Sequence, residues 1–206
     1  MVTNLAFLSG FAGGVSSMDL IRFAGIAAVL AGSVSMFFGG LLAERSEHDL
    51  FQADSRREAY EVRYERHEEL AELKDLYTKK GLSEEEAELV VNKIASDEGK
   101  FLEDILANEL HIHESQLRNP FAAGGVLGSS FFLGAVVPLI PYYLLTAKVD
   151  SLIWSVAISL VFLFAAGAWR GRLVQRAAWK SGLETLAVGA IASGLLYVIG
   201  SALTFV

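Results

Sequence analysis

Long uncharged runs alternate with one strongly charged segment along this chain. Five runs contain no Asp, Glu, Lys or Arg, namely 1–18, 23–43, 119–147, 151–169 and 185–206. A helix needs about 20 apolar residues to cross a bilayer core of about 30 Å. Four runs reach that length comfortably and the first comes close to it. The pattern therefore predicts an all-α membrane protein with five transmembrane helices.

The first run has an alternative interpretation as a cleavable signal peptide. Its small residues Ala12, Gly13 and Gly14 are compatible with a cleavage site, but the run lacks the basic start typical of such signals. Gly10 and Gly14 stand four residues apart, a spacing that lets membrane helices approach closely. We therefore interpret the run as a transmembrane helix with a packing face.

The polar segment divides the chain into three parts. Residues 1–43 carry transmembrane helices 1 and 2, residues 44–118 form a helical insert, and residues 119–206 carry transmembrane helices 3 to 5. Residues 44–114 hold 21 of the 24 acidic residues but only 10 basic ones. The insert is too small and polar to suggest a large core.

Local signals predict three helices in this insert. Lys79, Lys80 and Gly81 are typical of a helix C-terminus. Ser83, with Glu86 three residues later, has the spacing of a capping box at the start of a second helix that extends to about residue 95. A third helix is expected at about 97–110.

The first insert helix carries a stripe of carboxylates. If 58–72 is one helix, the glutamates fall within an arc of roughly 100°. Like charges three and four residues apart destabilise a helix, and nearby basic residues project mostly to other sides. Hard cations would relieve the repulsion, although a solvated acidic face is the alternative. The stripe consists of Glu58, Glu61, Glu65, Glu68, Glu69 and Glu72.

The run 23–43 continues towards this stripe without a proline, so both can belong to one long helix projecting from the membrane. Met36 lies in the middle of that run with Ser33 and Ser35 beside it, and it shares a helix face with Glu44; Glu47 follows. Such a track would join a soft sulfur ligand in the membrane to carboxylates at its mouth. A methionine that only packs is the alternative.

Composition excludes several other functions. There is no cysteine, which removes disulfides, thiolate metal sites and cysteine nucleophiles. The insert is acidic, so nucleic acid is not an expected partner. No catalytic triad, phosphate-binding loop or dinucleotide motif is present.

His111 and His113 are possible ligands, but surface histidines are the simpler interpretation. Carboxylates with occasional histidine and methionine suit divalent first-row metals better than catalysis, and no organic cofactor is expected.

The prolines predict a kink in the third span, and the basic loop predicts the orientation of the chain in the membrane. Pro138 and Pro141 predict a kinked third span. The basic loop after Trp169 is expected in the cytoplasm by the positive-inside rule. Counting spans back from it also places the insert there. The chain is thus expected to be an integral multi-pass protein of the lipid bilayer.

Residues 10–50 resemble the first two spans of the vacuolar iron transporter family. The specific part is the SxSMxxGGxLAxxSExD pattern at 33–49, and EELAELKDLYTKKGLSEEEAELV and PLIPY are also similar to family members. The resemblance implies a five-span homodimer that moves Fe(II), and often Mn(II), out of the cytosol in exchange for protons. It implies a location in the cell membrane or a vacuole-like organelle membrane.

The resemblance also implies a set of site residues. Two Glu-x-x-Glu pairs fall on Glu58/Glu61 and Glu69/Glu72, the third-helix glutamate falls on Glu109, and the span-two methionine falls on Met36. Glu65 and Glu68 are further candidate ligands, while Glu44, Glu47, Ser33 and Ser35 would line the pathway.

The chain departs from the family pattern at several positions. Ile105 and Leu106 stand where plant-type members have two methionines, and Ala28 replaces a span-two carboxylate. A span-one aspartate is expected just before the start of this chain. These differences keep open an alternative, a membrane-anchored metal-binding or sensing protein that does not transport. A partner-binding arm is a third possibility.

The path is expected at a subunit contact, because a polar path facing lipid is costly. Small residues available for that contact are Gly10, Gly14, Gly32, Gly39 and Gly40.

Overall fold

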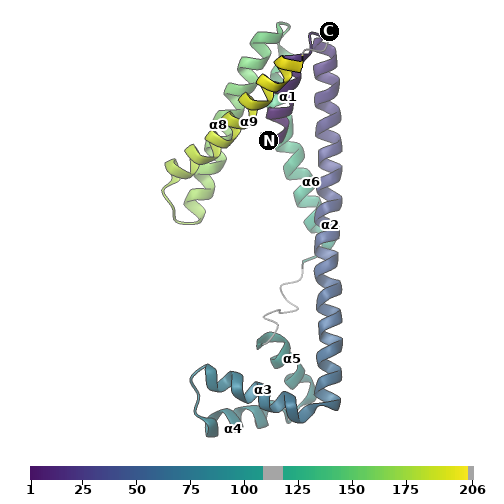
Figure 1. The fold of residues 1–206 in the computed structure, drawn as a ribbon, viewed down its shortest axis with the longest axis vertical. Coiled ribbons are helices and arrows are strands. Elements are labelled where there is room, and N and C mark those ends of the chain that lie inside the picture. Colours follow the sequence, from purple (N-terminus) through teal and green to yellow (C-terminus); the bar gives the residue numbers. More distant parts are fainter. Residues whose placement is uncertain (109–117, 204–206) are drawn as a thin grey trace. The chain divides into compact units, whose positions relative to one another are not determined.

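The computed structural model describes residues 1–108 and 118–203, and most of them are helical (Figure 1). In chain order, the elements are α1 (Val2–Gly14), α2 (Met18–Tyr64), α3 (Arg66–Lys79), α4 (Glu84–Ile94), α5 (Glu98–Asn108), α6 (Pro120–Val136), the 3-10 turn η2 (Val137–Leu139), α7 (Ile140–Leu144), α8 (Lys148–Leu173) and α9 (Ala178–Leu203).

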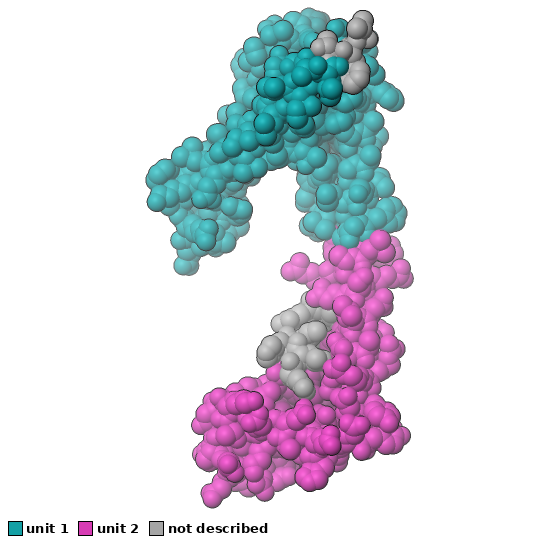
Figure 2. Space-filling view, viewed as in Figure 1, with its two compact units in different colours: residues 1–40, 124–206 teal, residues 41–123 magenta. Residues whose placement is uncertain are grey.

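These elements form two compact units (Figure 2). Unit 1 comprises Met1–Gly40 and Gly124–Val206, and unit 2 comprises Leu41–Ala123. Helix α2 contributes residues to both units.

Four helical segments among the described residues are long and apolar enough to cross a membrane. They are α2, the stretch Pro120–Leu144, α8 and α9. Helix α1 has 13 residues, which rise about 20 Å and fall short of a bilayer core of about 30 Å. The prediction of an all-α membrane protein is confirmed at this level, and the fifth span stays a prediction.

Glycines let α1 approach α9 closely (Figure 1). A Cβ atom on Gly13 would lie 2.5 Å from the Tyr197 carbonyl oxygen, and one on Gly14 would lie 2.7 Å from that of Gly200. Gly10 also faces α9, at Leu196. The predicted packing face therefore exists, but it is used within the chain. The expectation that Gly10 and Gly14 form a subunit contact is corrected accordingly.

The two prolines break the third apolar run as predicted. Helix α6 ends at Val136, and η2 and α7 follow. Proline lacks the N–H that would continue the helical ladder, and nearby carbonyls accept side-chain bonds instead. Ser155 Oγ donates to the Pro138 carbonyl oxygen at 2.6 Å, and Asn4 Nδ2 donates to that of Ala135 at 2.6 Å. These bonds tie α8 and α1 to the kink.

Helix α2 continues from the apolar run into the acidic segment, as predicted, but it ends at Tyr64. The expected single helix over 58–72 is wrong. Glu65 has φ −121° and ψ 26°, and α3 starts at Arg66. Few backbone bonds are lost, because the Glu65 N–H still donates to the Glu61 carbonyl oxygen at 2.7 Å.

Apolar packing in unit 2 accounts for the break. Most helical stability in proteins comes from packing an apolar face, and with α3 turned out of the line of α2, Leu73 is buried. The turn brings together a small core of Val62, Leu73, Val91, Ala95, Phe101 and Ile105.

The helix ends in unit 2 follow the local sequence signals. Helix α3 ends at Lys79, and Gly81 has a φ of +106°, which favours glycine. Ser83 and Glu86 form the predicted capping box at the start of α4. Helix α5 is described to Asn108, and the expected end of that helix lies outside the described residues.

Candidate metal centre

Three of the predicted glutamates converge in unit 2. Glu58 and Glu61 come from α2 and Glu69 from α3. Each offers a carboxylate oxygen, and the three oxygens lie within 4.8 Å of one another. We call these residues the carboxylate cluster. Several oxygen ligands at such separations suit a hard or borderline divalent cation.

The break at Glu65 creates this arrangement. Along one straight helix, Glu58 and Glu69 would be separated by about 16 Å, because each residue advances about 1.5 Å. Turning α3 away from the line of α2 instead brings their carboxylates together. Three of the six glutamates of the stripe therefore lie together in a cluster.

The cluster is partly removed from water. Glu58 is 2% exposed and Glu69 is 6% exposed, and the Glu61 side chain is 30% exposed. Burying a carboxylate is costly unless it is paired. The chain supplies one partner, since Arg57 Nη2 donates to Glu58 Oε1 at 2.8 Å and Arg57 Nε donates to the same oxygen at 3.2 Å.

Crowding affects the ionisation of the cluster. Burial and the nearby carboxylate of Glu58 raise the pKa of Glu61, and Arg57 opposes that shift only in part. The raised pKa means that Glu61 keeps a proton to a higher pH than an ordinary glutamate. Where Glu61 is protonated, a cation must displace that proton to bind, so binding is expected to weaken as the pH falls.

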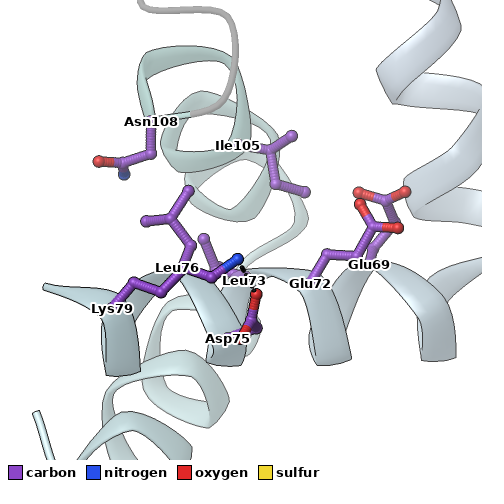
Figure 3. A pocket seen from close by; sticks show the side chains of 8 residues that line it. All are labelled: Glu69, Glu72, Leu73, Asp75, Leu76, Lys79, Ile105 and Asn108. Atoms are coloured by element: carbon purple, nitrogen blue, oxygen red, sulfur yellow. Dashed lines mark ion pairs between the residues drawn. The ribbon is translucent and has the colours of Figure 1, made fainter.

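A pocket of about 280 Å³ extends from the cluster between α3 and α5 (Figure 3). Glu69 and Glu72 both line it, and the close-up shows their carboxylates directed towards the same end. Ile105 and Asn108 of α5 line the opposite wall, and the Asp75–Lys79 ion pair lies below. Glu72 is exposed and is not one of the three clustered residues.

The remaining insert candidates lie elsewhere. Glu65 occupies the break, and both Glu65 and Glu68 are exposed. Glu109, His111 and His113 lie outside the described residues. Ile105 is buried in the core of unit 2 and faces the same pocket as Glu69.

The pathway candidates occupy varied positions along α2. Met36 is 45% exposed and Ser35 is also exposed, whereas Ser33 Oγ donates to the Val29 carbonyl oxygen at 2.6 Å. In unit 2, Glu44 Oε1 accepts a bond from the Arg118 N–H at 2.9 Å, and Glu47 is exposed.

Sequence reasoning missed Arg57, since it expects the nearby basic residues to project mostly away from the stripe. Arg57 neutralises part of the stripe, because it lies within 4.0 Å of Glu58 and Glu61 and also of Asp54 on the same helix. The spacing was visible, since Arg57 stands three residues after Asp54 and four before Glu61.

The membrane-length helices and the apolar surface of unit 1 define the class, which is an all-α, multi-pass membrane protein. A family model described as VIT family matches residues 1–201. The chain belongs to this family.

Curated plant relatives match nearly the whole chain. Vacuolar iron transporter 1 of Arabidopsis thaliana is 29% identical over 97% of this chain and 80% of its own length. Vacuolar iron transporter 2 of Oryza sativa subsp. japonica is 30% identical over 98% of the chain and 82% of its own length. A vacuolar iron transporter of Centaurea cyanus is 32% identical over 96% of the chain and 80% of its own length.

Proposed function

We propose that this protein moves divalent first-row metal, Fe(II) and also Mn(II), out of the cytosol in exchange for protons. On this proposal it is a five-span homodimer in the cell membrane or a vacuole-like organelle membrane. Unit 2 faces the cytoplasm and collects ions at Glu58, Glu61, Glu69 and Glu72, with Glu65, Glu68 and Glu109 as further ligands.

The main support is the convergence of three carboxylates within 4.8 Å in a family of transporters. The names of the relatives specify iron as their cargo. An all-oxygen ligand set also binds Mn(II) readily, which is why we include manganese. Proton exchange rests on the family resemblance, and the raised pKa of Glu61 is compatible with it.

The proposed route through the membrane follows α2. Helical spacing puts Met36 on one face with Glu44, and Ser33 and Ser35 lie near Met36 in sequence. Glu44 and Glu47 would receive ions at the cytoplasmic mouth and Met36 would bind them further in.

Uptake into proteoliposomes tests the function directly. Full-length protein should accumulate Fe(II) and Mn(II), and a pH gradient should increase the rate. Glu58→Gln/Glu61→Gln should lose at least tenfold in uptake at low metal concentration, because the pair supplies two of the three clustered ligands. The matched control is Glu84→Gln/Glu85→Gln, which removes two acids from the first turn of α4 and should transport normally.

A metal-binding or sensing protein that does not transport is the second candidate. The family resemblance implies a carboxylate in span two where this chain has Ala28, and the lack of that carboxylate favours a protein that does not transport. Saturable metal binding that depends on Glu58 and Glu61, without uptake under any gradient, would identify this function. Uptake abolished by the paired substitution would exclude it.

A further inference from the structure

The carboxylate cluster already contains a cation that the chain itself provides. Arg57 Nη2 lies 2.8 Å from Glu58 Oε1, and Arg57 Nε lies 3.9 Å from Glu61 Oε1. Arg57 Nη1 lies 3.8 Å from Asp54 Oδ1. The guanidinium thus balances charge beside Glu58 and Glu61, two of the three clustered carboxylates.

The guanidinium of Arg57 can move away from the carboxylates that it contacts. Its side chain is 58% exposed, whereas that of Glu58 is 3% exposed. The positive group can therefore swing into water on its flexible stem while the carboxylates stay in place. A divalent ion bound between Glu58 and Glu61 would repel it, because like charges a few ångströms apart are unfavourable even near a protein surface.

We propose that Arg57 is a tethered counter-ion that occupies the carboxylate cluster in the absence of metal and is displaced when a divalent cation binds. This inference rests on the proposed metal-collecting function of the cluster. Displacement sets a threshold for metal binding. An arriving ion must interact with the carboxylates more favourably than the guanidinium does.

The same exchange favours divalent over monovalent ions. A potassium or sodium ion would replace one positive charge with one positive charge, and it would lose the two hydrogen bonds that Arg57 donates to Glu58. A divalent ion adds a second charge to a group of carboxylates, so its Coulomb gain is larger. Arg57 thereby excludes the abundant monovalent cations without a size-selective cavity.

Equilibrium binding of Mn(II) to full-length protein, read from the spectrum of the free ion by electron paramagnetic resonance, tests the proposal. Arg57→Gln should bind Mn(II) about tenfold more tightly at low ionic strength, and the gain should shrink in high salt because the group is largely exposed. Arg63→Gln is the matched control, since Arg63 pairs with Glu98 at 3.5 Å, and it should stay within twofold of the wild type.

Monovalent competition gives a second expected difference. When potassium chloride replaces N-methylglucamine chloride at equal ionic strength, Mn(II) binding should weaken more in Arg57→Gln than in the wild type. Equal or weaker Mn(II) affinity in a folded Arg57→Gln protein would overturn the proposal. If that binding is still abolished by Glu58→Gln/Glu61→Gln, the metal-collecting function stands. Binding that does not depend on these glutamates overturns both.

A measurement on the unmodified protein avoids dependence on the variant. Phenylglyoxal labels accessible arginines, and peptide mass analysis separates Arg57 from Arg63. Adding Mn(II) should raise the labelling of Arg57 several-fold and leave that of Arg63 unchanged. Unchanged or reduced labelling of Arg57 at saturating Mn(II) would contradict displacement.

Discussion

Ile105 is an apolar residue beside glutamates in the pocket between α3 and α5. Its side chain is 2% exposed, belongs to the core of unit 2 and lines the pocket that Glu69 and Glu72 share. An aliphatic group there leaves the ligand set composed of oxygen. Oxygen ligands discriminate weakly between Fe(II) and Mn(II), whereas a thioether favours the softer ion.

We predict that Ile105→Met with Leu106→Met raises the preference for Fe(II) over Mn(II) several-fold. The swap nearly conserves volume, so the free energy of unfolding should change by less than about 1.5 kcal/mol. Anaerobic competition binding measures the preference. Leu102→Met is the control, because Leu102 lies on the same helix but lines a different pocket. If both proteins select alike, the sulfur ligand does not determine selectivity.

At the scale of elements, α1 and α9 are held together by the close approach of their backbones. A Cβ atom on Gly13 would lie 3.0 Å from the Ser201 nitrogen and closer still to the Tyr197 carbonyl oxygen. Both of these neighbours are backbone atoms, which cannot move aside as a side-chain end can. Membrane helices associate through such packing because lipid provides no hydrophobic drive between them.

We therefore expect Gly13→Ala to lower the free energy of unfolding by about 1–3 kcal/mol through overpacking. Gly194→Ala is the matched control, since the described part of the chain places no atom of another segment within 4 Å of its Cβ position on α9. That change should be neutral or stabilising, because alanine is the better helix former. Thermal unfolding in detergent micelles compares them, and equal midpoints for the two variants would argue against the α1–α9 contact.

At the scale of the whole molecule, Met36 tests whether α2 lines a metal path. Its side chain is 45% exposed in unit 1, so it fills no core position there. Among the described residues, no atom of another part of the chain lies within 4 Å of the Cβ position of Gly39, three residues on. Gly32 and Gly40 face Phe131 and Gly124 of the same chain. A subunit contact at Gly39 stays a prediction.

We predict that Met36→Leu abolishes most transport while folding and assembly persist. An exposed, volume-conserving change should cost well under about 1.5 kcal/mol of stability, so a large loss of uptake would reflect a lost sulfur ligand. Liposome uptake gives the rate, and size-exclusion chromatography with light scattering gives the assembly. Leu30→Met, on an exposed position of α2, controls for a general effect of substitution. Wild-type uptake by Met36→Leu would refute this path.

Composition and local sequence signals were enough to predict the class of the protein and many of its helix ends. Uncharged runs of about 20 residues indicate membrane-spanning helices, because their length and composition match what the bilayer core requires. The end of α3 and the capping box of α4 depend on residues close together in sequence, Gly81, Ser83 and Glu86 among them. The prolines that end α6 act through their own ring geometry.

Tertiary structure alone decided the break at Glu65 and everything that depends on it. The choice between one helix and two depends on whether Leu73 can bury itself against residues of α4 and α5, which are distant in sequence. That packing turns α3, brings Glu69 to Glu58 and Glu61, and leaves Arg57 beside the buried Glu58. The residue types were visible in the sequence, but their juxtaposition required the fold, because electrostatic contacts depend on distances that helical periodicity alone does not give.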